Sequence, residues 1–190
     1  INCKNTKNET ALHIASYNSF YQIVKYLVEH GADVNLRNTD DCSPLHFAAA
    51  LKSFEIVKCL IERGADIHCR NVENNTALHY AAYSGSLEFV EYLTECGADV
   101  NCKNNEDGCP LHFAAEQNLY EIVKYLVEHG ADIHCTSVEN NTGLHHAAYS
   151  GSLEIVKCLI ECGADVNCKN NHDYSPLYYA AQVNSLEIVK

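Results

Sequence analysis

Two short segments within residues 38–70 place apolar side chains at the spacing of an α-helix. In such a pattern, residues three or four apart share one face of the helix, and that face is the one that packs inward. The apolar positions are Leu45, Ala48 and Ala49 in the first segment and Ile56, Val57, Leu60 and Ile61 in the second. The pattern predicts two amphipathic helices separated by a few polar residues.

The residues that flank these segments indicate where each helix begins and ends. Ser43 precedes Pro44, and a hydroxyl at the cap followed by proline in the first turn is a frequent helix start. A second helix is expected to begin near Ser53, with Glu55 in its first turn, where a carboxylate is stabilised by the helix dipole. Gly64 lies where a left-handed residue ends many helices. The following residues, 65–75, are polar and rich in turn formers, which predicts an extended loop or hairpin.

The same pattern recurs every 33 residues without an insertion or deletion. The tripeptide Gly-Ala-Asp begins at Gly31, Gly64, Gly97, Gly130 and Gly163, and the helix-start position is occupied by Thr10, Ser43, Thr76, Cys109, Thr142 and Ser175. A fixed period of this length is typical of a repeat array. The predicted organisation is a partial loop at 1–4, five repeats at 5–37, 38–70, 71–103, 104–136 and 137–169, and a truncated sixth repeat at 170–190.

One 33-residue unit is not expected to fold alone. Its apolar side chains bury too little surface to offset the conformational entropy of its backbone. Each helix pair must therefore pack against neighbours on both sides, so the array is expected to form one solenoid domain over residues 1–190.

The segments "SPLHFAA", "TALHYAA", "CPLHFAA", "LEIVKCLI" and "GADVN" resemble the ankyrin repeat, and the resemblance covers essentially the whole chain. It implies an all-α solenoid of L-shaped units, each with two antiparallel helices and a projecting β-hairpin. It also implies protein–protein binding through the hairpin tips and the face of the first helices.

Net charge and hydropathy argue against nucleic-acid binding and membrane insertion. The formal net charge is −12, and a phosphate backbone is bound by clustered Lys and Arg, so binding to nucleic acid is not expected. No apolar run approaches the length needed to cross a bilayer, so membrane insertion is not expected either. Because the chain contains no Met, Ile1 is not expected to be the natural start of the protein.

Five of the eleven cysteines occupy one position of the repeat, namely Cys3, Cys69, Cys102, Cys135 and Cys168. Equivalent positions in stacked helical units lie about 10 Å apart, which is too far for a disulfide. A thiol-rich column of this kind predicts a reducing, intracellular and cytoplasmic setting. No Cys-x-x-Cys pair is present, and Cys158 with Cys162 is an isolated pair, so no metal site is predicted.

A histidine also recurs once per repeat, at His13, His46, His79, His112 and His145. The ankyrin resemblance implies that this imidazole bonds the helix-start hydroxyl and nearby hairpin backbone, which is a structural role. Cys109 replaces the hydroxyl beside His112, and this pair is the one conceivable nucleophile; no third orienting group accompanies it. We expect no catalytic residue, no cofactor and no enzymatic activity.

Several positions alternate with a period of 66 residues. The hairpin tip is Asn8, Asp41, Asn74, Asp107, Asn140 and Asp173, residue types that tolerate positive φ. The position after Asp-Val or Asp-Ile alternates between Asn and His: Asn35, His68, Asn101, His134 and Asn167. Two-repeat duplication accounts for the alternation and predicts two kinds of face along the array.

The end of every second first helix carries a tyrosine, at Tyr17, Tyr83 and Tyr149. Tyrosine is a frequent interface anchor, but these rings are equally suited to packing on the neighbouring first helix. We hypothesise that they form a partner-facing row together with the acids of the hairpin fingers, Asp40, Glu73, Glu106 and Glu139.

The segments "LVEHGADVN", "LTECGADVN" and "LIECGADVN" resemble asparaginyl-hydroxylase acceptor sequences in ankyrin repeats. That resemblance implies possible hydroxylation of Asn35, Asn101 and Asn167, although hydrogen bonding within the hairpin is the simpler role for these side chains.

The sequence is therefore interpreted as part of a longer ankyrin-repeat protein that serves as a non-catalytic scaffold for another protein. The alternative is a recognition or regulatory module of a larger enzyme or channel whose working domain lies outside these 190 residues. Neither the partner nor the oligomeric state follows from the sequence.

Overall fold

A computed structural model describes all residues from Ile1 to Lys190. It contains twelve α-helices and divides into two compact units, Ile1–Asp99 and Val100–Lys190. The first unit holds α1 (Ala11–Tyr17), α2 (Tyr21–Glu29), α3 (Pro44–Ala50), α4 (Phe54–Glu62), α5 (Ala77–Ser84) and α6 (Leu87–Glu95). The second holds α7 (Pro110–Glu116), α8 (Tyr120–Glu128), α9 (Gly143–Tyr149), α10 (Leu153–Glu161), α11 (Pro176–Gln182) and α12 (Leu186–Val189). The predicted all-α repeat architecture is confirmed.

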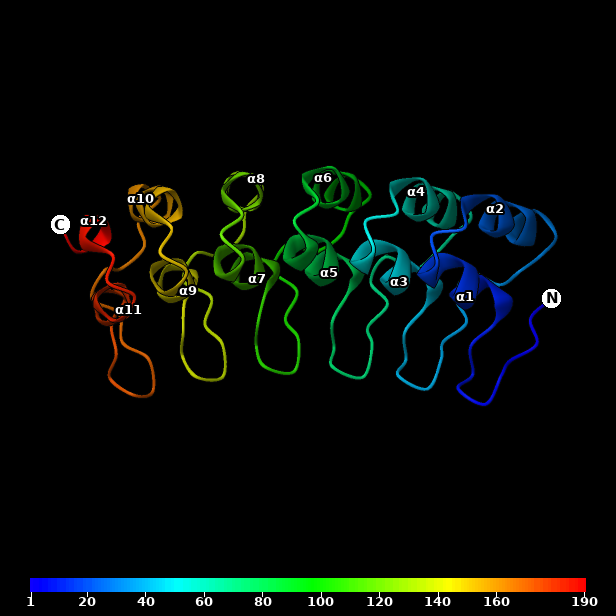
Figure 1. Cartoon of the computed structure of the whole chain (residues 1–190), viewed down its shortest axis with the longest axis horizontal. Helices are drawn as coiled ribbons and strands as arrows, with labels where there is room; N and C mark the ends of the chain where they lie inside the picture. The colour runs from blue at the N-terminus through cyan, green and yellow to red at the C-terminus, as the bar shows by residue number, and fades with distance from the viewer. The chain divides into compact units, whose positions relative to one another are not determined.

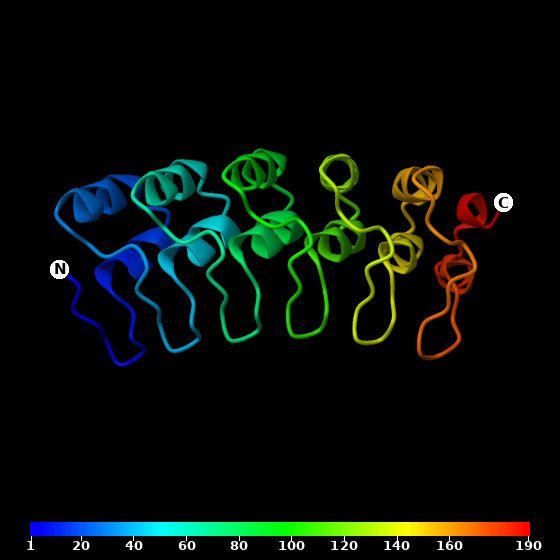
Figure 2. The same cartoon turned by 180° about the vertical axis from the view of Figure 1, so that it is seen from behind.

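Within each unit the helices form two rows (Figures 1 and 2). In the first unit α1, α3 and α5 pack in succession, and α2, α4 and α6 form the second row above them. The second unit repeats this arrangement with α7, α9 and α11 in one row and α8, α10 and α12 in the other. The hairpin loops project from the first-helix row, on the side away from the second helices.

The helix boundaries follow from local sequence. Ser43 is the N-cap of α3, and Pro44 occupies its first turn. The backbone N–H of Ser43 donates to Nδ1 of His46 at 3.1 Å, so the imidazole satisfies an amide at the helix start. The same bond to a histidine three residues on recurs at Thr10, Thr76, Cys109 and Thr142.

The apolar stripes of the sequence form the interior of each unit. Leu45, Ala48 and Ala49 are 1%, 0% and 0% exposed. From the second helix, Val57 and Leu60 are fully buried as well. Alanine on the first helix lets neighbouring first helices approach closely. The core combines one buried leucine from each of α1, α3, α5, α7 and α9 with apolar side chains larger than alanine from the second helices.

The loops obtain their shape from single residues with positive φ. Gly64 follows α4 with φ of 84°, as predicted for the residue that ends a helix. At the hairpin tip Asp41 has φ of 55°, and all six Asn or Asp residues at this position share the conformation. Asn38 stabilises the turn because its side-chain oxygen accepts the backbone N–H groups of Asp40 and Cys42, each at 2.9 Å.

The hairpin arms are irregular and do not form the β-strands that the resemblance implied. An isolated antiparallel bridge, Thr136 with Thr142, is the only β pairing. Some backbone hydrogen bonds of the arms join neighbouring hairpins. The N–H of Val72 donates to the carbonyl of Asp40 at 3.0 Å, and the N–H of Val138 donates to the carbonyl of Glu106 at 2.9 Å. These bonds help hold successive hairpins in register.

Asparagine side chains form a second link between neighbouring repeats. The amide of Asn35 donates to the carbonyl of Gly64 at 2.9 Å, and its oxygen accepts the backbone N–H of Asp66 at 2.8 Å. Asn101 makes the same two bonds, to Gly130 at 2.9 Å and from Asp132 at 2.8 Å. His68 and His134, which alternate with these residues, make no side-chain hydrogen bond. The Asn/His alternation therefore changes the hydrogen bonding between successive repeats.

Candidate functional site

The three tyrosines predicted to face a partner lie at or near the ends of α1, α5 and α9. Tyr17, Tyr83 and Tyr149 are 57%, 54% and 55% exposed. More than half of each side chain is therefore in contact with solvent, although each ring is large and apolar.

Two of these rings also pack against the next first helix. Tyr17 lies edge-on to Phe47 with ring centroids 5.8 Å apart, and Tyr149 lies edge-on to Tyr179 at 5.9 Å. Such T-shaped contacts fix the orientation of a ring without covering its outer face. Tyr17 and Tyr149 therefore pack on the neighbouring first helix and still present an exposed face. A role of the three tyrosines in binding a partner stays a prediction.

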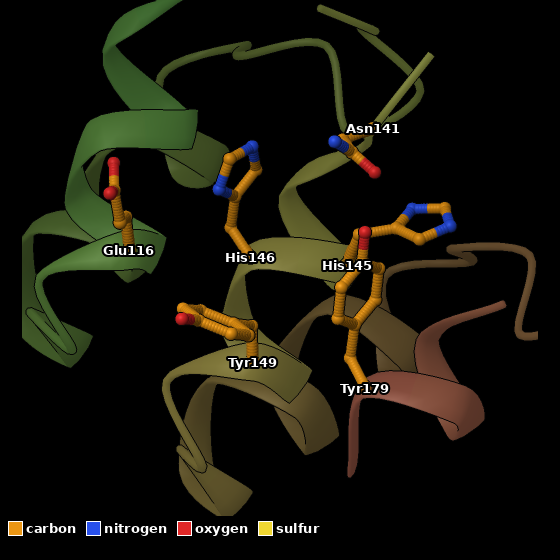
Figure 3. Close-up of a pocket in the computed structure, with 6 residues that line it drawn as sticks. All are labelled: Glu116, Asn141, His145, His146, Tyr149 and Tyr179. Atoms are coloured by element: carbon orange, nitrogen blue, oxygen red, sulfur yellow. The ribbon is translucent and has the colours of Figure 1, made fainter. Parts of the chain in front are cut away.

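Tyr149 and Tyr179 border a shallow pocket of about 210 Å³ in the second unit, shown in Figure 3. Glu116 at the end of α7, His146 on α9, and Asn141 and His145 also line it. The hydroxyl of Tyr179 accepts a hydrogen bond from the amide of Asn170 at 3.0 Å, so this ring is held at both edges. The pocket could not be predicted from the sequence, because its residues come from three different repeats.

The pocket combines a carboxylate with neutral aromatic groups. Burial, together with nearby His145, lowers the pKa of His146 to about 4, so its imidazole is neutral at pH 7. His146 packs against His112 with centroids 5.3 Å apart. Glu116 is exposed at the rim. The pocket therefore carries one negative charge beside two phenol rings and a neutral imidazole.

The finger acids lie along the exposed hairpins. The carboxylates of Glu73 and Glu139 accept hydrogen bonds from Asn75 at 2.9 Å and from Asn141 at 3.3 Å, and so support their own turns. Asp40 and Glu106 make no side-chain hydrogen bond or ion pair within their units. The predicted row therefore contains acids of two kinds, and its role in binding stays a prediction.

The recurrent histidines are buried at the helix starts and make the predicted hydrogen bonds. In His46, Nδ1 accepts the backbone N–H of Ser43 and lies 3.0 Å from the hydroxyl oxygen, while Nε2 donates to the carbonyl of Asn75 at 3.1 Å. Burial lowers the pKa of His46, which keeps the imidazole neutral. The ring thus joins the start of a helix to the next hairpin, and both of its nitrogens are used.

A cluster of Cys109, His112 and Cys135 is the one group of three potential metal ligands, and it was not predicted from the sequence. The two sulfur atoms and an imidazole nitrogen lie within 4.8 Å of one another, and all three residues are buried. Both ring nitrogens of His112 are already bonded, Nδ1 to the N–H of Cys109 at 3.1 Å and Nε2 to the carbonyl of Cys135 at 3.0 Å. A metal ion would have to displace one of these bonds and would still lack a fourth protein ligand.

The proposed hydroxylation sites differ in their surroundings. Asn35 and Asn101 are exposed, but their amides form the inter-repeat links described above. Asn167 is exposed, and its backbone N–H donates to Asp165 at 2.9 Å. Hydroxylation of the three residues stays a prediction.

Comparison with known families places these features in context. A family model described as ankyrin repeats in three copies matches residues 1–71, 45–137 and 111–190. The chain belongs to the ankyrin repeat family. Ankyrin repeats are in general protein–protein interaction modules and are typically non-catalytic. No helix of this ankyrin-repeat chain is both long and apolar enough to span a bilayer.

The chain is also similar to a short part of a much longer curated protein. Over 35 residues it is 57% identical to alpha-latroinsectotoxin-Lt1a from Latrodectus tredecimguttatus. The match spans 18% of this chain and 2% of the toxin.

Proposed function

We propose that this ankyrin-repeat chain is a non-catalytic scaffold that binds another protein through the hairpins and first-helix row. The observation that carries the proposal is that Tyr17 and Tyr149 lie edge-on to a ring of the next first helix while more than half of each side chain is exposed. An oriented aromatic ring loses little conformational entropy on binding, which is why tyrosine is common at interface centres.

The pocket beside Tyr149 indicates the chemistry of the partner. Its wall contains Glu116, the rings of Tyr149 and Tyr179, and the neutral imidazole of His146. A lysine or arginine side chain suits this combination, because its apolar stem packs on the rings while its charged end approaches the carboxylate. The net charge of −12 favours the approach of a basic segment as well.

Selection from a displayed peptide library tests the proposal and does not require the partner to be identified beforehand. We expect enriched peptides to contain lysine or arginine beside apolar residues, and to bind more weakly as salt concentration rises. Their dissociation constants are measured against the wild-type chain and the double variant Tyr83→Ala, Tyr149→Ala. Loss of two exposed anchors is expected to weaken binding by about tenfold or more.

The matched control is Tyr26→Ala, because Tyr26 is 59% exposed on the second helix α2. It removes a tyrosine of similar exposure from the other row and is expected to leave binding unchanged. Glu116→Gln tests the pocket, and it is expected to weaken only the peptides that carry a basic residue. A folded double variant that binds as tightly as wild type would overturn the proposal.

A second candidate function is a recognition module within a longer enzyme or channel. The 35-residue similarity to a long toxin supports this arrangement, since a segment resembling part of this chain lies within a much longer protein. The same surface would then bind the target of that protein. The full-length coding sequence distinguishes the two, because a catalytic or pore-forming domain in the same chain would support the second.

A further inference from the structure

In three repeats the helix-start side chain lies close to a cysteine 26 positions further along the chain. Thr142 and Cys168 show the geometry, with the hydroxyl oxygen 3.7 Å from the sulfur. Ser43 and Cys69 form the same kind of hydroxyl–thiol pair in the first unit. The helix-start position and the cysteine position are therefore neighbours in these repeats.

At one repeat both positions are occupied by cysteine. Cys109 replaces the usual Ser or Thr, and its sulfur lies within 4.8 Å of that of Cys135. Cys109 is fully buried and Cys135 is 7% exposed. His112 holds the two residues together, since it bonds the backbone N–H of Cys109 and the carbonyl of Cys135. Both cysteines are reduced in the structure.

We propose that Cys109 and Cys135 are a redox-active dithiol that closes to an intramolecular disulfide on reaction with a small-molecule disulfide such as oxidised glutathione. The sulfur atoms must approach to about 2 Å for the bond to form. The starting separation is short enough for side-chain rotation and a small movement of the loop at Cys135, which has no regular secondary structure.

The reaction is a thiol–disulfide exchange in two steps. The thiolate of Cys135 attacks one sulfur of oxidised glutathione, which forms a mixed disulfide and releases one glutathione thiolate. Cys109 then loses its proton and attacks the Cys135 sulfur, which breaks the mixed disulfide and releases the second glutathione. The two protein thiols are oxidised by two electrons in total, and glutathione disulfide is reduced to two thiols.

The surroundings favour Cys135 as the first nucleophile. It is the more exposed of the two, and the hydrogen bond from the Cys109 thiol lowers the pKa of Cys135 to about 7. That same hydrogen bond, together with burial, raises the pKa of Cys109 well above its usual value. The thiolate is therefore available on the residue that the oxidant reaches more easily.

A disulfide fits the cluster better than a metal ion does. Closing the bond leaves the two backbone hydrogen bonds of His112 intact, whereas ligation would break one of them. The Cys109–Cys135 bond would join the start of α7 to the loop that follows α8 and would restrict opening of that repeat.

Tryptic peptide mapping reads out this bond directly, because the two cysteines fall in different peptides with one cysteine each. Cleavage after Lys103, Lys124 and Lys157 gives peptides 104–124 and 125–157. The folded chain is equilibrated in buffers from fully reduced to fully oxidised glutathione, alkylated and digested. We expect the linked peptide pair to be absent in reduced buffer and to be the main form of both peptides in oxidised buffer.

Variants at Cys109 and Thr142 provide matched controls. Cys109→Ser places a hydroxyl beside Cys135, as in the pair of Ser43 and Cys69. The variant is therefore expected to fold and to lose the linked peptide. If the serine variant is unstable, Cys109→Thr is used in its place, because threonine occupies the same helix-start position at Thr76 and Thr142. Adding Thr142→Cys to Cys109→Ser is expected to create a new link between peptides 125–157 and 158–169, because the Thr142–Cys168 pair has the same geometry.

Three results would overturn the proposal. One is recovery of Cys109 and Cys135 as alkylated peptides in oxidised buffer. Another is a stable glutathione adduct on Cys135 without the linked pair. The third is stoichiometric zinc, detected by mass spectrometry of the intact folded protein after addition of zinc alone, that protects both thiols and prevents the link.

Discussion

The side-chain oxygen of Asn35 accepts the backbone N–H of Asp66, 31 residues further along, at 2.8 Å. With the bond from its amide to Gly64, this asparagine fastens one repeat to the loop of the next. Asn101 repeats the arrangement, whereas His68 and His134 stand at the intervening positions without such bonds. The alternation of Asn and His thus makes successive repeat junctions unequal.

Replacing Asn101 with alanine is expected to destabilise the protein more than replacing His134. Asn101→Ala removes two hydrogen bonds at an exposed site, which corresponds to about 1 kcal/mol of unfolding free energy. His134→Ala is the matched control in the alternate repeat, and its expected cost is about 0.5 kcal/mol or less. Urea denaturation measures both, and equal losses would show that the asparagine link contributes nothing.

The hydroxyl of Ser16 is buried in α1 without a hydrogen-bond partner. The equivalent positions Ala49, Ala82, Ala115 and Ala148 carry alanine and are fully buried. Ser16→Ala is therefore expected to raise the unfolding free energy by about 1 kcal/mol, because it removes an unsatisfied polar group. Thermal unfolding of the single variant checks this, and a lower melting temperature would reveal a partner for the hydroxyl.

Gly143 begins α9 where the matching repeat has Ala77. A Cβ at this position would meet Leu111 at 3.5 Å and Leu159 at 3.7 Å, which are ordinary van der Waals contacts. Gly143→Ala is expected to stabilise the protein by about 0.5–1 kcal/mol, because alanine loses less backbone entropy on folding. Chemical denaturation measures the change. The control is Gly64→Ala, which is expected to destabilise, since Gly64 has φ of 84°.

Acid is expected to destabilise the second unit through its buried histidines. Burial, and then nearby His146, lowers the pKa of His112 from 6.5 to about 4. The unfolded state therefore binds protons before the folded state does, so stability is complete above about pH 6.5 and falls as pH approaches about 4. His112 alone accounts for about 3 kcal/mol of that loss.

Measuring unfolding free energy at about pH 7.5 and about pH 4.5 tests this dependence. Carboxylates also titrate in this range, so the informative comparison is with His146→Tyr, which copies Tyr80 of the matching repeat. This variant removes one buried imidazole and the charge that lowers the pKa of His112. Its loss of stability in acid is expected to be smaller than that of wild type, and an equal loss would contradict the assignment.

Much of the fold could be predicted from the sequence, because it depends on contacts between residues close together in the chain. The cap at Ser43 and the left-handed residues Asp41 and Gly64 act over a few positions, and the structure has each of them as predicted. The exposure of Tyr149 could also be predicted, because this residue lies at the end of a first helix, where side chains reach the surface.

The candidate site was harder to predict because it joins residues from different repeats. Glu116 and Tyr179 line one pocket but lie 63 positions apart. Cys109 and Cys135 lie in different columns, so comparing equivalent positions of the repeat did not bring them together. The signal in the sequence is the offset of 26 residues between the helix-start position and the cysteine position, which pairs Cys109 with Cys135.

The sequence by itself determined the helix pairs, their caps, their turns and the period at which they repeat, because each is set by nearby residues or by a regular apolar pattern. Only the tertiary structure decided which side chains of neighbouring repeats meet: the link from Asn35 to Asp66, the ring of Tyr149 against Tyr179, and the contact of Cys109 with Cys135. These contacts depend on the offset with which one repeat stacks on the next, and the packing of the buried helices sets that offset.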